Sequence, residues 1–139
     1  MTEKKIDFWQ DHSVNYLEMA FRHDHDEVLS HPDGYGKKTG DCGDTIEFFL
    51  LVTDQVITRV SFRINGCRNT YACANTIVHL VEGHPVNSAW DITPERVCAY
   101  LKTLPADHFH CAELAVGALY LALANIQDTQ RAPWKKLYR

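Results

Sequence analysis

The chain has 139 residues, of which 45% are hydrophobic and 23% are charged. That is enough apolar sequence for the core of one compact domain and too little chain for two. Asp and Glu number 18 against 14 for Lys and Arg, which gives a net charge near −4. Nucleic-acid binding requires a basic surface, so we expect no nucleic acid among the partners.

The cysteine content indicates the redox environment of the protein. The first ten residues, "MTEKKIDFWQ", lack the apolar stretch of a secretory signal, and no later run approaches the length of a membrane span. We therefore expect a soluble, cytoplasmic protein that does not contact a membrane. Five cysteines is an odd number for a disulfide framework, so reduced thiols that can bind metal are the stronger interpretation.

Polar and glycine-rich sequence dominates the first third of the chain. "VNYLEMAF", residues 14–21, has the apolar spacing of a short helix. Residues 22–43 contain four glycines and predict a loop, with room for a short edge strand. We expect the four histidines of this region to lie on the solvated surface. They are His12, His23, His25 and His31.

Two alternating apolar runs, residues 46–52 and 58–64, predict an antiparallel hairpin with its turn at 53–55. The first strand begins just after Cys42, and the second ends just before Cys67. Because the two strands run in opposite directions, the hairpin brings Cys42 and Cys67 to the same edge of the sheet.

Three helices are predicted after the hairpin. Apolar spacing places the first at 69–82, and Thr93 with Pro94 begins a second that runs to about residue 101. The third and longest runs from about 111 to 127. Its small residues suit close packing against a sheet.

The five cysteines fall into two groups by position. Cys73 and Cys98 lie inside predicted helices, where we expect them to pack as small apolar residues. Cys42, Cys67 and Cys111 lie at the ends of elements. Cys111 opens the last helix, where the helix dipole and free backbone N–H groups favour the thiolate, so we expect it to be the easiest to ionise.

A carboxylate and an imidazole accompany these three cysteines. Asp44 lies two residues after Cys42, and an extended backbone projects both side chains to one side. Thiolates hold zinc or iron tightly whereas a carboxylate releases them more readily, so this set predicts a labile metal site. His110 either competes with Asp44 for the fourth position or accepts a proton beside Cys111. The chain has no CxxC motif, so spacing alone leaves scattered structural cysteines as the alternative.

Four stretches of the sequence resemble one family, and they occur in the family's order. They are "TGDCGDTIEFFL", "RINGCRNTYACANTIVHLVEG", "ITPERV" and "LPADHFHCAELAVGALYLALAN". Over about residues 34–127 the chain resembles the N-terminal scaffold domain of NifU and its IscU relatives, on which iron–sulfur clusters are assembled. The resemblance implies an α+β fold, in which a small three-stranded antiparallel sheet carries helices on one face and the C-terminal helix is long. We divide this single domain into an N-terminal helix and polar loop (1–33), the scaffold proper (34–128) and a basic C-terminal tail (129–139).

The resemblance also implies residue roles and partners. Cys42, Cys67 and Cys111 match the ligands of a transient [2Fe–2S] cluster, Asp44 matches an aspartate whose loss tends to trap the cluster, and His110 matches the histidine beside the third cysteine. The implied partners are a cysteine desulfurase that supplies sulfur, an iron donor and recipient apoproteins. On this interpretation the protein is a free-standing scaffold, monomer or dimer, and not an enzyme, although it could itself accept sulfur.

Two departures from the family pattern qualify this resemblance. Typical IscU chains carry "LPPVK" before the histidine, whereas this chain has "LPADH" with His108 in place of the lysine, which leaves recognition by the dedicated chaperone open. Zinc-dependent SufU relatives carry an insertion between the second and third cysteines, and the 44 residues from Cys67 to Cys111 leave no room for it. The alternative function is a zinc-organised, SufU-like sulfur acceptor, and zinc in purified protein is compatible with either function.

Overall fold

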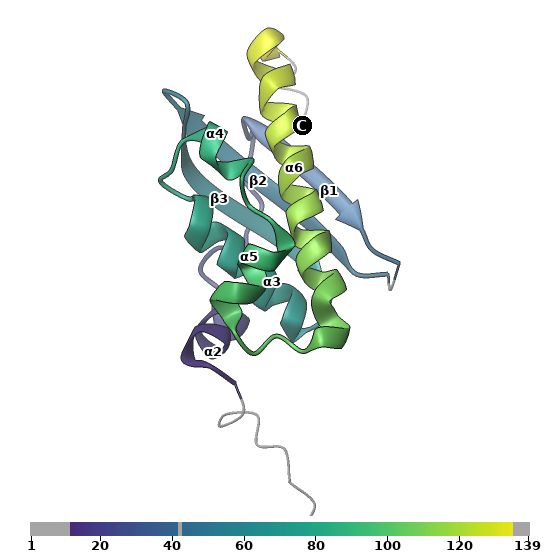
Figure 1. The fold of residues 1–139 in the computed structure, drawn as a ribbon. Helices are drawn as coiled ribbons and strands as arrows, with labels where there is room; N and C mark the ends of the chain where they lie inside the picture. Colours follow the sequence, from purple (N-terminus) through teal and green to yellow (C-terminus); the bar gives the residue numbers. More distant parts are fainter. Residues whose placement is uncertain (1–11, 42, 135–139) are drawn as a thin grey trace, which may run out of the picture.

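The computed structural model describes residues 12–41 and 43–134. A three-stranded antiparallel sheet has the order β1-β2-β3, which confirms the predicted sheet (Figure 1). Its strands are β1 (Gly34–Thr39), β2 (Thr45–Thr53) and β3 (Val56–Asn65). Thr45 pairs with Asn65, so the start of β2 and the end of β3 lie at the same edge, as the hairpin predicts.

Six helical segments accompany the sheet in the described part of the chain. The short α4 and the single 3₁₀ turn η1 were not expected from the sequence, and the last helix extends beyond both of its predicted ends. The segments are α2 (Val14–Phe21), α3 (Arg68–Val81), α4 (Val86–Ala89), α5 (Pro94–Leu101), η1 (Ala106–His108) and α6 (Phe109–Arg131).

Local sequence signals explain where these helices begin. The Ser13 side chain accepts a hydrogen bond from the Tyr16 backbone N–H at the start of α2, and Thr93 does the same for Arg96 in α5, with Pro94 in the first turn. Helix α3 begins directly after β3, with Cys67 as its N-cap residue and no side-chain cap. Backbone N–H groups of its first turn therefore lie close to the Cys67 thiol.

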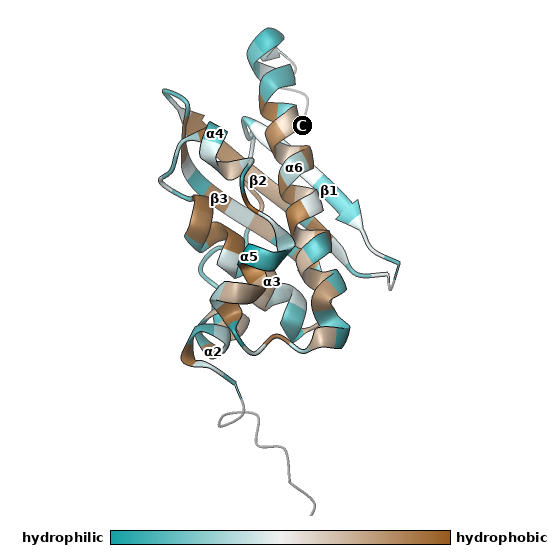
Figure 2. Cartoon of the chain, in the orientation of Figure 1, coloured by the Kyte–Doolittle hydropathy of each residue, from teal (hydrophilic) through white to brown (hydrophobic). Residues whose placement is uncertain are grey.

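Helices α3 and α6 lie across the same face of the sheet (Figure 1). Figure 2 shows hydrophobic residues concentrated on β2, β3 and the helices that cover them, while the far end of α6 is hydrophilic. The large side chains of this layer, including Phe48, Phe62 and Leu119, are fully buried. The core therefore lies between the sheet and the helices.

Strand β1 and helix α6 approach each other unusually closely. A side-chain carbon built on Gly36 would lie 2.4 Å from the Ala122 backbone nitrogen and 2.5 Å from the Ala118 backbone oxygen. Gly34 is crowded in the same way by Ala122 and Ile126. Two glycines on the strand and alanines on the helix thus let two backbones touch, which confirms the predicted close packing of the last helix.

The long last helix corrects one expectation from the sequence. Residues 106–131 are long and apolar enough, by length and composition alone, to cross a membrane, so the expectation that no run approaches this length is wrong. However, 56% of the most apolar window is buried inside the structure. Its apolar side chains are used in the core between the sheet and α3.

His25 is a second correction, because it is buried and not solvated. Its side chain is only 7% exposed, and its ring Nδ1 lies 2.8 Å from the Val60 carbonyl oxygen. The Phe62 N–H donates to the His25 carbonyl, and Asp26 forms an isolated bridge with Phe62 of β3. The short backbone segment around His25 thus covers part of the β3 edge and satisfies polar groups there.

Candidate metal centre

The two described cysteines of the predicted site meet at the ends of α3 and α6. Cys67 caps α3, and Cys111 lies in the first turn of α6. The Thr70 Oγ1 atom lies 3.5 Å from the Cys67 Sγ and 3.8 Å from the Cys111 Sγ. Thiols that are 44 residues apart in the sequence therefore share one buried hydroxyl group.

Asp44 joins this cluster from the start of β2. The Thr70 hydroxyl donates a hydrogen bond to Asp44 Oδ2 at 3.0 Å. A side-chain carbon on Gly66 would lie 3.0 Å from the same carboxylate oxygen, so the glycine before Cys67 leaves room for Asp44. Of the predicted ligands, only Cys42 lies outside the described residues.

Two histidines flank Cys111. Nε2 of His110, which the sequence singled out, lies 3.7 Å from the Cys111 Sγ. Nδ1 of His108 lies 3.9 Å from the same sulfur. The ligand atoms of Cys67, Cys111 and His108 all lie within 4.8 Å of one another, and theirs is the one such trio among the described residues. His108 was not among the ligands predicted from the sequence, although its spacing of three from Cys111 could have indicated a shared helical face.

The two thiols differ in their ease of ionisation. Partial burial alone would raise the pKa of Cys67, but hydrogen bonds from the Thr70 hydroxyl and the backbone N–H groups of Thr70 and Asn69 outweigh it, and the pKa is lowered. Burial raises the pKa of Cys111 to about 12. The expectation that Cys111 ionises most easily is therefore wrong. Cys111 is fully buried whereas Cys67 is exposed, and loss of solvation exceeds the effect of the helix end.

A comparison with known proteins places this arrangement in a family. Residues 24–132 match the NifU-like N-terminal domain. The chain belongs to this family. It is 29% identical over 101 residues to the iron–sulfur cluster assembly scaffold protein IscU of Aquifex aeolicus, a match that covers 70% of this chain and 64% of the relative. It is also 30% identical over 84 residues to IscU 1 of Archaeoglobus fulgidus, which covers 60% and 55% respectively.

These matches span less than two thirds of the length of either relative. Solved structures agree on the fold. A protein from Fervidobacterium islandicum AW-1, described as a candidate scaffold for iron–sulfur cluster assembly in the SUF system, has a TM-score of 0.69 at 14% identity and covers 84% of this chain and 99% of its own. A NifU-like N-terminal structure from Brucella abortus has a TM-score of 0.67 at 17% identity and covers 84% and 94%.

The donor atoms of this NifU-like domain suit soft and borderline metals. Thiolate sulfur and imidazole nitrogen are preferred ligands of zinc and iron, and a carboxylate oxygen binds either metal less tightly. The exposed Cys67 makes the site reachable from solvent, while Cys111 anchors it to the core. Cys73 is fully buried and Cys98 half-buried. The burial of Cys73 confirms its expected packing role. Neither Cys73 nor Cys98 belongs to the trio of Cys67, Cys111 and His108.

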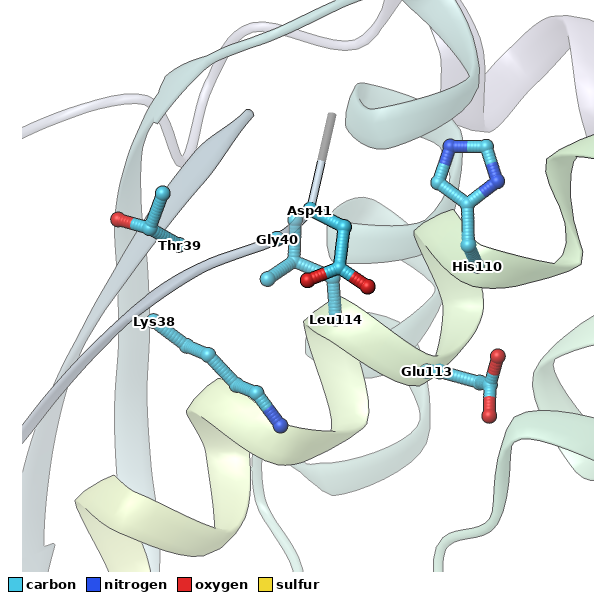
Figure 3. A pocket seen from close by; sticks show the side chains of 7 residues that line it. All are labelled: Lys38, Thr39, Gly40, Asp41, His110, Glu113 and Leu114. Carbon is cyan, nitrogen blue, oxygen red and sulfur yellow. The ribbon is translucent and has the colours of Figure 1, made fainter. Parts of the chain in front are cut away.

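An open groove of about 550 Å³ adjoins this centre. Figure 3 shows it between the end of β1 and the first turns of α6, with Lys38 and Asp41 on one side and His110 and Glu113 on the other. The groove carries both signs of charge. His110 lines the groove and its Nε2 also lies 3.7 Å from the Cys111 Sγ, so this imidazole lies between the groove and the candidate centre.

Proposed function

We propose that the protein is a scaffold on which a labile [2Fe–2S] cluster is assembled and from which the cluster is passed on. The observation that supports this most directly is the meeting of the Cys67 and Cys111 thiols with the Asp44 carboxylate around one hydroxyl, in a chain of the NifU-like family. The proposed cluster ligands are Cys42, Cys67 and Cys111, with Asp44 or His110 in the fourth position.

The donor set accounts for both binding and release of this cargo. Thiolates provide the strong bonds to iron, and a single oxygen or imidazole ligand provides a weaker one. A cluster held by such an asymmetric set, at a site open to solvent through Cys67, is accessible to a recipient's own cysteines. Ligand exchange can then begin at the weakest bond.

Cys67 is the proposed acceptor of sulfur from a cysteine desulfurase. Its lowered pKa and exposure favour a thiolate that can attack the outer sulfur of the desulfurase persulfide. A new S–S bond forms at Cys67, the old one breaks, and the desulfurase cysteine leaves as a thiolate, with no net redox change. Conversion of this sulfur to cluster sulfide then requires two electrons from an external reductant. The remaining proposed partners are an iron donor and recipient apoproteins in the cytoplasm.

Anaerobic reconstitution tests this function. The protein would be incubated with ferrous iron, cysteine, a cysteine desulfurase and a thiol reductant, and followed by visible absorption and Mössbauer spectroscopy. We expect the spectrum of a [2Fe–2S] cluster from the unmodified protein and from Cys98→Ser, and its loss from Cys67→Ser and Cys111→Ser. Colourless protein that keeps stoichiometric zinc after this treatment would contradict the scaffold and support the zinc-organised sulfur acceptor.

A further inference from the structure

We propose that His108 is the third protein ligand of a single divalent ion, such as zinc, with tetrahedral coordination. Cys67 and Cys111 provide the other two protein ligands of this ion when no cluster is present. This inference deepens the proposed function and rests on it in one respect, namely that the same two thiols also hold the cluster. A lysine stands at this place in the LPPVK stretch of typical IscU chains, so the ligand is a feature of this sequence.

The three ligand atoms already have nearly the spacing that a tetrahedral ion requires. With zinc–sulfur bonds of about 2.3 Å and zinc–nitrogen bonds of about 2.0 Å, sulfur and nitrogen ligands lie about 3.5 Å apart and two sulfurs about 3.8 Å apart. The Cys111 Sγ and the His108 Nδ1 lie 3.9 Å apart, and all three atoms lie within 4.8 Å of one another. Side-chain shifts of less than about 1 Å would bring them to bonding distance.

The backbone explains why His108 faces the two thiols. His108 ends η1, three residues before Cys111, so both side chains project from one face of the first helical turn. Cys67 meets that face from the N-terminal end of α3. His108 is half-buried against this junction, which limits the rotamers that its ring can adopt and holds the imidazole near the sulfurs.

His110 has a different position. Its Nε2 contacts the Cys111 Sγ, but His110 is not part of the trio that includes Cys67. His110 is exposed and lines the groove with Asp41 and Glu113 (Figure 3). The two imidazoles therefore flank Cys111 in different surroundings. Of the two, only the His108 imidazole lies close to the sulfur atoms of both Cys67 and Cys111.

Asp44 has another hydrogen-bonding partner in this arrangement. Its Oδ2 accepts the Thr70 hydroxyl hydrogen, and the carboxylate is not part of the trio either. Recruiting Asp44 as a metal ligand at this oxygen would compete with that hydrogen bond, whereas His108 is already in place. A single ion bound through His108 would thus occupy the two thiols until cluster assembly begins.

Cobalt titration of the metal-free protein tests this ligand. Co²⁺ bound by thiolates gives charge-transfer and d–d absorption, and competition with Zn²⁺ then gives the zinc affinity. We expect His108→Ala and His108→Lys to weaken Co²⁺ and Zn²⁺ binding at least about tenfold, since even the loss of a group that only orients a ligand costs about 10- to 100-fold. His84→Ala, which alters an exposed histidine of the α3–α4 connection, is the control and should bind as the unmodified protein does.

The competing variant is His110→Ala. A larger loss of Co²⁺ affinity in His110→Ala than in His108→Ala would assign the third ligand to His110 and overturn the inference. Equal affinity in His108→Ala and the unmodified protein would overturn it as well. Zinc K-edge X-ray absorption of the bound ion gives an independent measurement, in which we expect the imidazole scattering of the unmodified protein to be lost in His108→Ala.

The two proposals fail in different ways. If the protein binds Co²⁺ through His108 but forms no cluster under reconstitution, the scaffold function fails and the His108 ligand stands. If a cluster forms and His108→Ala binds Co²⁺ like the unmodified protein, only the His108 ligand fails. Far-UV circular dichroism of each variant, expected to match the unmodified protein, separates loss of a ligand from loss of the fold.

Discussion

A single buried hydroxyl group links the residues of the candidate metal centre. Thr70 is fully buried, donates to Asp44 and contacts the sulfur atoms of Cys67 and Cys111. In the sequence, Thr70 is only one polar residue in the first turn of a predicted helix, and nothing in its spacing distinguishes it. Its role appears only when β2, α3 and α6 meet. The same is true of His108, whose value as a ligand depends on where α3 begins.

The hydroxyl of Thr70 should control how readily Cys67 reacts. Thr70→Val keeps the shape of the side chain but removes a hydrogen bond that lowers the pKa of Cys67. Because such bonds contribute about 1 kcal/mol, we expect the midpoint of the pH–rate profile for iodoacetamide alkylation of Cys67 to move upward by up to about one pH unit. Thr70→Ser keeps the hydroxyl and should react like the unmodified protein. Mass spectrometry of the Cys67 peptide measures the rate.

The order of reaction among the cysteines provides an internal check. Burial raises the pKa of Cys73, Cys98 and Cys111, the last of these to about 12. Near neutral pH these groups are protonated, and alkylation requires the thiolate. Cys67 should therefore be modified before any of the three in the folded protein. Modification of Cys111 first would contradict the structure of the site.

At the scale of elements, the hairpin and helices α2, α3 and α6 follow from apolar periodicity, whereas α5 follows from its Thr93 cap and Pro94. Strand β1 follows from neither, because it begins "GYG" and its glycines indicate a loop. Those glycines are there because α6 crosses the strand at backbone contact distance. The sequence shows that a residue is small, but only the tertiary structure shows which atoms a larger side chain would clash with.

Two glycine substitutions of equal size should differ in their effect on stability. Gly36→Ala would place a carbon 2.4 Å from the Ala122 backbone nitrogen, and we expect it to destabilise the fold by about 1–3 kcal/mol or more. Gly117→Ala would meet only the flexible end of the Lys38 side chain, at 2.6 Å from its Nζ. Alanine gains about 0.5–1 kcal/mol over glycine in a helix, so this variant should be neutral or more stable. Urea unfolding midpoints measure both, and equal destabilisation would contradict the described strand–helix contact.

At the scale of the whole molecule, the candidate metal centre lies where three separate parts of the chain meet. The hairpin alone predicts that residues near the start of β2 and the end of β3 are neighbours. It does not predict that Cys111 joins them, because that depends on the direction in which α6 packs across β1. The family resemblance predicted Cys111 as the third cysteine of the site, whereas the spacing of the cysteines alone was also compatible with scattered structural cysteines.

Metal binding should therefore stabilise the whole fold, since one ion would connect α3 to the start of α6. A ligand that binds only the folded state adds about 2.7 kcal/mol when its free concentration is about 100 times Kd, which raises the unfolding midpoint on the order of 10 °C for a chain of this size. We expect zinc to produce such a shift in the unmodified protein and in Cys98→Ser, and a chelator to reverse it. Cys67→Ser should lose most of the shift, because removing one thiol leaves α3 without its ligand. Differential scanning calorimetry at fixed free zinc measures the effect. An equal shift in Cys67→Ser would mean that zinc binds elsewhere and that the centre does not join these elements.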